Sequence, residues 1–172
     1  MSPRRVVVTG MGMVTPLGCG VDVSWRRLIE GQSGIRRITR FEVDDLPAKI
    51  AGQLPSGDEE GAFRVDDVMA PKDARKNDLF IIYGVAAASE AIRDAGWTPE
   101  DDDERQRTGV LIGSGIGGLS TIADTAVELE QRGPRRVSPF FIPASLINLV
   151  SGQVSIRFGF KGPNHSVVTA CR

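Results

Sequence analysis

The chain has 172 residues, of which 41% are hydrophobic and 25% charged, and its formal net charge is -1. This composition is typical of a globular domain with a sizeable core, and it excludes a disordered tail. A net charge so close to zero gives no general attraction to nucleic acid or to anionic membranes, so we expect neither as a partner.

The beginning of the sequence predicts the compartment. Two basic residues and three apolar ones precede Thr9 and Gly10, which is too short for a signal peptide. Apolar runs along the chain are also far shorter than a membrane span. We therefore expect a cytoplasmic protein, in which Cys19 and Cys171 are thiols rather than a disulfide.

Strand and helix patterns alternate from the start of the chain. Residues 5–9 are a β-branched run that predicts a strand. Residues 22–30 predict a helix with Asp22 as its N-cap and Gly31 just past its end. Residues 32–76 are rich in Gly, Pro and Asp, which predicts an irregular surface excursion with one strand at residues 49–54.

The rest of the chain has clearer periodicity. Small and apolar residues along one face predict a helix over residues 77–95. Further elements are expected in this order: a buried strand over residues 109–113, a helix over 120–131, a helix over 143–157 that begins at Pro143, and a strand that ends at 169–170. Apolar strands separated by helices predict an α/β fold with a mostly parallel sheet covered by helices.

A Gly-rich turn follows the buried strand. Its sequence, Gly113-Ser114-Gly115-Ile116-Gly117-Gly118, fits the G-x-G-x-x-G pattern of dinucleotide binding. That function also needs an acidic residue about 20 positions later at the end of a second strand, and the sequence has none there. We therefore favour glycines that let the backbone turn tightly beside another buried element, and keep dinucleotide binding as an alternative.

Three side chains are candidates for chemistry. Cys171 ends an apolar strand, where a following helix N-terminus would favour the thiolate, although composition alone favours an inert thiol. Cys19, between two glycines, is expected to be structural. His165, the only histidine, is expected to cap the turn after Pro163 or to lie partly exposed in it. One histidine and two distant cysteines offer no metal-ligand spacing, so no metal or cofactor is expected.

Five segments in a fixed order span nearly all of the chain. They are residues 6–18 (VVVTGMGMVTPLG), 31–35 (GQSGI), 113–118 (GSGIGG), 138–143 (SPFFIP) and 162–171 (GPNHSVVTAC). Together they resemble the beta-ketoacyl-[acyl-carrier-protein] synthases, and most of all the type II condensing enzymes of bacterial fatty-acid synthesis. No single segment would be sufficient.

The resemblance implies a thiolase-like fold, in which two similar halves form a layered α-β-α-β-α sandwich that pairs as a homodimer. Residues 1–172 match most of the N-terminal half, and the C-terminal half is absent. Cys171 would take the acyl group from an acyl-carrier protein as a thioester, and malonyl-carrier protein would then condense with it by decarboxylation. The family's two catalytic histidines, its lysine and its second oxyanion donor would lie beyond residue 172.

The resemblance also gives roles to other residues. Ile116 resembles a residue that lines the acyl-chain pocket, and Phe141 resembles a dimer contact that helps to close the partner's pocket. The basic patch that receives the acidic carrier protein is matched by Lys72, Arg75, Lys76, Arg135 and Arg136. Without the resemblance, we would expect a core phenylalanine and a solvated basic loop.

The match departs at Arg172, where the family has small residues that begin a buried helix. We therefore expect a truncated, frameshifted or divided chain that is inactive alone. Two alternatives stay open. One is a non-catalytic module that retains carrier binding or dimerisation, and the other is a dinucleotide-dependent enzyme that uses Gly113 to Gly118.

Overall fold

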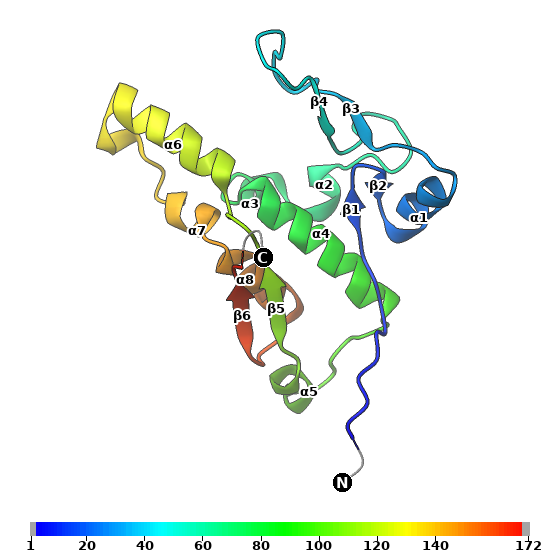
Figure 1. Cartoon of the computed structure of the whole chain (residues 1–172). Helices are drawn as coiled ribbons and strands as arrows, with labels where there is room; N and C mark the ends of the chain where they lie inside the picture. The colour runs from blue at the N-terminus through cyan, green and yellow to red at the C-terminus, as the bar shows by residue number, and fades with distance from the viewer. Residues whose placement is uncertain (1–2, 170–172) are drawn as a thin grey trace. The chain divides into compact units, whose positions relative to one another are not determined.

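The computed structural model describes residues 3–169, and the chain divides into two compact units (Figure 1). The first unit comprises the residues up to 64 together with residues 86–97, and the second comprises residues 65–85 and those from 98 onwards. Helix α4 (Leu79–Asp94) contributes to both. It confirms the helix predicted over residues 77–95 to within two residues at its start and one at its end.

The first unit contains two antiparallel strand pairs and one longer helix. These elements are β1 (Val14–Thr15) with β2 (Gly18–Cys19), β3 (Ile35–Arg37) with β4 (Ile50–Gly52), and α1 (Val21–Ile29). The predicted strand over residues 49–54 is therefore present as β4, and its partner β3 was not predicted. Gly20 rather than Asp22 occupies the N-cap of α1, so the predicted cap is wrong. Gly31 follows the helix with φ 70°, as its C-terminal signal predicted.

The predicted strand over residues 5–9 is not formed within the described part of the chain. Residues 6–8 are 68% to 89% exposed, and their β-branched side chains have no neighbouring strand to complete a ladder. The segment that follows lies directly on the backbone of α4. A Cβ on Gly12 would come within 2.0 Å of the carbonyl oxygen of Ala87, so only glycine permits this approach.

The second unit is built on a parallel strand pair. Strand β5 (Val110–Gly113) pairs with β6 (Asn164–Val167), and helix α8 (Asn148–Phe158) packs on both. The first turns of α4 approach α8 so closely that a Cβ on Gly84 would lie 2.4 Å from Val150 Cγ2. The buried apolar side chains of this core come from all these elements except β6 and include Ile81, Ile82, Val85, Val110, Val150 and Val154.

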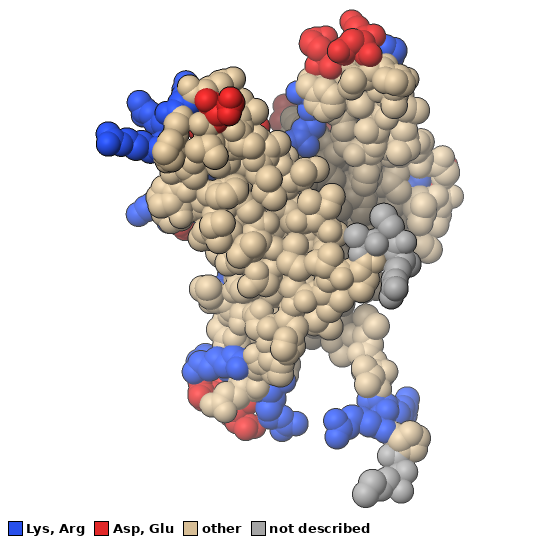
Figure 2. Space-filling model, turned by 60° about the vertical axis from the view of Figure 1, so that its left-hand side comes forward, with Lys and Arg blue, Asp and Glu red and all other residues tan. Residues whose placement is uncertain are grey.

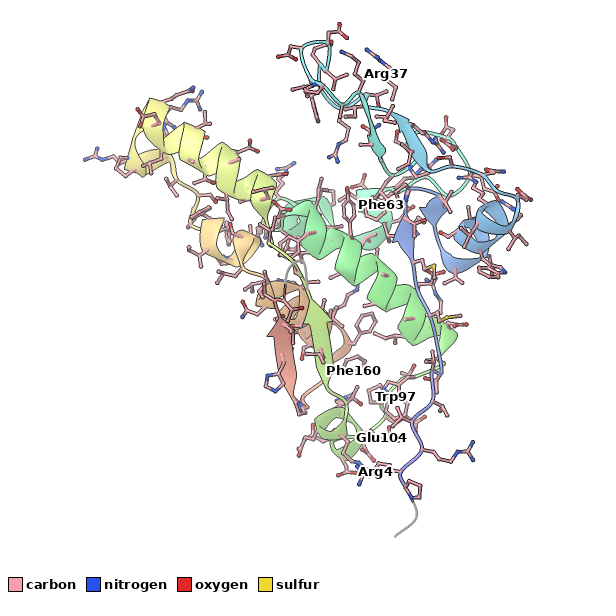
Figure 3. All side chains as sticks on the ribbon, in the orientation of Figure 1. Arg4, Arg37, Phe63, Trp97, Glu104 and Phe160 are labelled. Carbon is pink, nitrogen blue, oxygen red and sulfur yellow. The ribbon has the colours of Figure 1, made fainter. Side chains whose placement is uncertain are left out.

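The remaining helices of the second unit are mostly short. They are α2 (Val65–Val68), α3 (Pro71–Ala74), α5 (Asp102–Arg107), the 14-residue α6 (Leu119–Arg132), the 3-10 turn η1 (Pro134–Arg136) and α7 (Phe141–Ser145). Helix α6 confirms the helix predicted over residues 120–131. Beyond α8, Phe160 is buried and stacks on Phe158 with ring centroids 5.7 Å apart (Figure 3).

Two predictions for the last third of the chain are wrong. The single helix expected over residues 143–157 is split into α7 and α8, because Leu146 takes an extended conformation with ψ 137°. His165 is not a turn residue: it lies exposed in β6, opposite Leu111. The expected parallel pairing is confirmed for β5 and β6, whereas the pairs of the first unit are antiparallel.

Candidate functional site

The Gly-rich turn after β5 packs against the end of α7. Gly117 has φ 90°, and a Cβ there would lie 2.5 Å from the carbonyl oxygen of Ser145. The Gly118 N–H donates to the same oxygen at 3.0 Å. These glycines therefore allow close backbone contact, as the sequence favoured, and an N–H that a pyrophosphate would need is already bonded. Ile116 lies at the exposed tip, 64% accessible.

The parallel pairing of β5 and β6 brings two predicted functional segments to one sheet edge. Gly113 lies opposite Val167, and the Ser114 N–H extends the ladder by donating to the Val167 carbonyl oxygen at 3.2 Å. The carboxyl ends of parallel strands meet at the same edge, so the turn with Ile116 and the segment that leads to Cys171 leave the sheet together. Cys171 itself lies outside the described residues.

A polar cluster fixes β6 to α8. Ser151 is fully buried, and its hydroxyl lies 2.8 Å from Asn164 Oδ1. Asn164 Nδ2 donates back to the Ser151 carbonyl oxygen at 3.0 Å. This reciprocal pair holds the start of the strand that runs toward Cys171. Sequence reasoning placed Asn164 in the motif but gave it no role.

Phe141 and part of the predicted basic patch border one small cavity of about 110 Å³. Arg75, the C-cap of α3, and Thr125 of α6 line it, and Phe141, the first residue of α7, is half-buried beside them. Lys76 Nζ lies 5.5 Å from the ring centroid of the neighbouring Phe140. The structure therefore brings the predicted Phe141 together with one of the five predicted cations, Arg75, and places a second, Lys76, over the ring of the neighbouring Phe140.

The five cations fall into two groups. Lys72 and Arg75 are exposed on α3 and its C-cap, and Lys76 follows them. Lys76 forms a 2.9 Å ion pair with Asp73 and holds the pKa of that carboxyl below its ordinary value.

Arg135 and Arg136 form the second group, exposed in η1 beyond the C-terminal end of α6. Figure 2 shows Lys and Arg side chains projecting at this tip, at the upper left of the view. Arg75 shares a cavity with Thr121 in the first turn of α6, whereas Arg135 and Arg136 follow its last turn, so these cations lie near opposite ends of a helix about 21 Å long.

Asp78 and Thr121 were missed in the sequence. Asp78, only 9% exposed, accepts from the Thr121 N–H at 3.0 Å and from its hydroxyl at 2.7 Å. Its other oxygen accepts from the Phe80 N–H, so one carboxylate caps the starts of α4 and α6 together. An Asp directly before an apolar helix is the sequence pattern that could have revealed this cap. The bonds between Asp78 and Thr121 fix the helix that follows the Gly-rich turn.

Within residues 3–169, no cluster of three His, Cys, Asp or Glu side chains is suited to hold a metal ion. None of the helices in that range has the length and apolar character needed to cross a membrane. Cys19 is half-buried in β2, where its backbone N–H donates to the Gly61 carbonyl oxygen at 2.8 Å.

Comparison with known proteins identifies the family to which this architecture belongs. The model of the "Beta-ketoacyl synthase, N-terminal domain" family matches residues 3–171. The chain is 62% identical over 169 residues to 3-oxoacyl-[acyl-carrier-protein] synthase 2 of Rhizobium meliloti, covering 98% of this chain and 40% of that protein. It is 46% identical over 184 aligned positions to the mitochondrial 3-oxoacyl-[acyl-carrier-protein] synthase of Arabidopsis thaliana, covering 99% and 39%.

A solved structure shows the same fold. The ishigamide ketosynthase/chain length factor superposes with a TM-score of 0.78 at 27% identity, covering 96% of this chain and 40% of that one. The mixed α/β arrangement is thus that of the N-terminal half of a thiolase-like ketosynthase. The chain spans about 40% of the length of the curated relatives it matches. It belongs to the beta-ketoacyl synthase family, through the N-terminal domain of that family.

Proposed function

We propose that this chain provides the acyl-accepting part of a beta-ketoacyl-[acyl-carrier-protein] synthase of fatty-acid elongation. The observation that carries the proposal is the parallel pairing of β5 with β6, which brings the turn of Ile116 and the strand leading to Cys171 to one sheet edge. The five ordered segments and the 62% identity to a 3-oxoacyl-[acyl-carrier-protein] synthase 2 support it. We assign the reaction to the cytoplasm, as the sequence predicts.

The proposed chemistry proceeds in two steps. The Cys171 thiolate attacks the carbonyl carbon of an acyl-carrier-protein thioester, forming acyl-Cys171 and releasing the carrier as its thiolate, which takes a proton from water. Malonyl-carrier protein then loses CO2, and its α-carbon attacks the acyl-Cys171 carbonyl. A carbon–carbon bond forms, the cysteine leaves as thiolate, and beta-ketoacyl-carrier protein is the product. The resemblance assigns the residues that assist the second step to positions outside residues 1–172.

Ile116 and Phe141 are proposed to border the acyl chain. An exposed isoleucine at the tip of a rigid, glycine-packed turn can supply an apolar wall without moving. Replacing Ile116 by Phe should lower kcat/KM for long acyl chains more than for short ones. Equal effects on both chain lengths would contradict this role.

A second copy of the chain is the proposed partner for α6 and β6. Helix α6 has no buried residue, and Leu119, Ile122 and Leu129 lie exposed along one side of it. Strand β6 pairs with β5 on one edge, and no other strand within residues 3–169 pairs with it. Both surfaces have the character of an interface. In light scattering, Leu129→Asp should reduce the dimer fraction, whereas Asp124→Asn on the same helix should not.

Acyl transfer to Cys171 is the decisive test. The natural full-length protein is incubated with acyl-carrier protein, and peptides are analysed by mass spectrometry. We expect the acyl mass on Cys171, none on Cys19, and loss of transfer in Cys171→Ala. Iodoacetamide should modify Cys171 and abolish condensation. Transfer that persists in Cys171→Ala would overturn the proposal.

A further inference from the structure

The segment that carries three predicted docking cations is weakly embedded in its unit. We call residues 69–76 the basic segment, because it carries Lys72, Arg75 and Lys76. No residue between positions 65 and 76 is buried, and neither α2 nor α3 contains a buried side chain. Core packing therefore does not fix the orientation of these cations, and specific bonds must do so.

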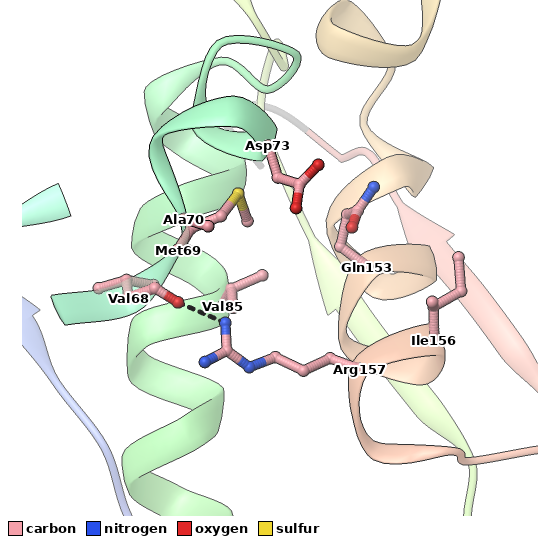
Figure 4. A pocket seen from close by; sticks show the side chains of 8 residues that line it. All are labelled: Val68, Met69, Ala70, Asp73, Val85, Gln153, Ile156 and Arg157. Atoms are coloured by element: carbon pink, nitrogen blue, oxygen red, sulfur yellow. Dashed lines mark hydrogen bonds between the residues drawn. The ribbon is translucent and has the colours of Figure 1, made fainter. Parts of the chain in front are cut away.

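A cleft of about 320 Å³ separates the basic segment from α8 (Figure 4). Its lining residues from the two sides include Met69, Asp73, Gln153, Ile156 and Arg157. Open space replaces van der Waals contact here, so the segment gains little dispersion energy from α8. A single bond across this space therefore has a large influence on where the segment lies.

Arg157 makes that bond. Its Nη1 donates to the carbonyl oxygen of Val68, 89 positions away in the sequence, across the cleft (Figure 4). Val68 is the last residue of α2, where carbonyl groups lack partners within the helix, and a guanidinium donor bonds such an oxygen strongly. The base of Arg157 is rigid because α8 buries Val150 and Val154 in the core.

The other end of the basic segment has its own attachments. Lys76 Nζ lies over the Phe140 ring, and Asn77 Nδ2 donates to the Asp73 carbonyl oxygen at 2.9 Å. The segment is thus held at one end by the bond of Arg157 to Val68, just before its first residue, and at the other end by the contacts of Lys76 and Asn77. Lys76 is itself a predicted carrier contact. Arg157 is not, so its loss would test orientation separately from the loss of a direct carrier contact.

We propose that Arg157 is a positioning residue for carrier-protein docking, acting through its bond to Val68 to orient the basic segment. The inference rests on the proposed function. Without this bond the segment samples more orientations, and an acidic carrier must order it on binding, which weakens binding without changing the chemistry that follows. Lysine can supply the charge but not the planar fork that aims the guanidinium donor at this carbonyl.

The test uses the natural full-length protein with Arg157→Met, Arg157→Lys and the control Arg107→Met, an exposed arginine of α5. We expect Arg157→Met to raise KM for acyl-carrier protein about 5-fold to 10-fold with kcat nearly unchanged, Arg157→Lys to show a smaller rise, and Arg107→Met none. Hydrogen exchange at residues 65–76 should accelerate in Arg157→Met, to a smaller extent in Arg157→Lys, and not in Arg107→Met. An unchanged KM, or unchanged exchange at these residues, would overturn the inference.

Combination with Lys72→Ala separates positioning from direct contact. If Arg157 acts through the basic segment, the effects of Arg157→Met and Lys72→Ala on KM should be non-additive. Fully additive effects would show that Arg157 contacts the carrier itself and would contradict the inference.

Lys76→Glu tests the proposed function. If it weakens carrier binding and Arg157→Met does not, only the inference fails. If neither does, the proposed docking surface fails. Should Arg157→Met not fold, Arg157→Lys in the same measurements decides.

Discussion

Thr121 donates both its backbone N–H and its hydroxyl to one buried oxygen of Asp78, at 3.0 Å and 2.7 Å. The carboxylate belongs to the start of α4 and the threonine to the first turn of α6, so the pair fixes the helix that follows the Gly-rich turn. Because a buried hydrogen bond to a charged group is worth about 1.5–3 kcal/mol, Asp78→Ala should lower the free energy of unfolding by about 2–3 kcal/mol.

Urea denaturation of Asp78→Ala, Thr121→Val and the control Thr125→Val checks this prediction. Thr121→Val removes only the hydroxyl bond and should cost less than Asp78→Ala, because the N–H bond remains. Thr125 lies one helical turn further along α6, and its hydroxyl is not bonded to Asp78. A loss in Thr125→Val as large as that in Thr121→Val would show that threonine packing, rather than the bond to the carboxylate, stabilises this helix start.

The Gly-rich turn allows the two interpretations of its glycines to be separated. A Cβ on Gly118 would lie 2.8 Å from the Ala144 carbonyl oxygen, whereas a Cβ on Gly115 would meet nothing within 4 Å. Neither glycine has a positive φ, so the difference is steric. Gly118→Ala should therefore destabilise the protein by about 1–3 kcal/mol, and Gly115→Ala by less than about 0.5 kcal/mol.

Thermal unfolding with and without NAD completes the comparison. We expect no shift in Tm, because the Gly118 N–H is bonded to the Ser145 carbonyl oxygen. In a dinucleotide site Gly115 would be the sensitive position, since the pyrophosphate approaches the backbone at the second glycine of the motif. Stabilisation by NAD that Gly115→Ala abolishes would restore that alternative.

Sequence periodicity predicted the elements whose own residues form a distinct apolar pattern. Helices α4 and α6 have long apolar faces, and β5 is an uninterrupted apolar run, so local pattern and fold agree. The strand expected over residues 5–9 failed because a strand needs a partner, and none pairs with it in the part of the chain that the structure describes. The prediction of one unbroken helix over residues 143–157 failed at Leu146. Just before the break, the Ser145 carbonyl oxygen accepts from the Gly118 N–H of the turn, a long-range contact that no local pattern encodes.

The candidate site likewise has features that the sequence predicts and features that only the structure shows. The sequence picked out Arg75 and Phe141 separately, and only the structure shows that they border one cavity. Arg157 bonds to a backbone carbonyl 89 positions away, and any residue type can provide such an acceptor. Residues that act through long-range backbone contacts leave no motif.

Glu90 on α4 replaces a missing helix cap in the first unit. Its Oε1 accepts from the Val21 N–H and its Oε2 from the Met13 N–H, both at 2.8 Å, while the N-cap residue of α1 makes no side-chain cap bond. Glu90→Ala should lower the free energy of unfolding by about 1–3 kcal/mol, because two backbone donors lose their partner. Glu90→Gln, which keeps one acceptor oxygen, should fall between, and Arg93→Ala on the same helix should be nearly neutral. A Glu90→Ala loss no larger than that of Arg93→Ala would contradict the capping role.

Acid should destabilise the first unit through Glu59. Arg36 donates to both Glu59 oxygens at 2.9 Å, and these bonds hold the pKa of Glu59 below its ordinary value. A carboxyl whose folded-state pKa is depressed binds fewer protons than its unfolded form, so its contribution is present above the unfolded pKa and is lost as pH falls through the folded one. The urea concentration at the unfolding midpoint, measured from pH 6 downwards, should therefore decrease once the pH is below about 4.

In Arg36→Met the pKa of Glu59 returns toward its ordinary value, and the part of this decrease that is due to the pair should disappear. Identical pH profiles in the two proteins would show that other carboxyl groups, not this pair, control acid stability.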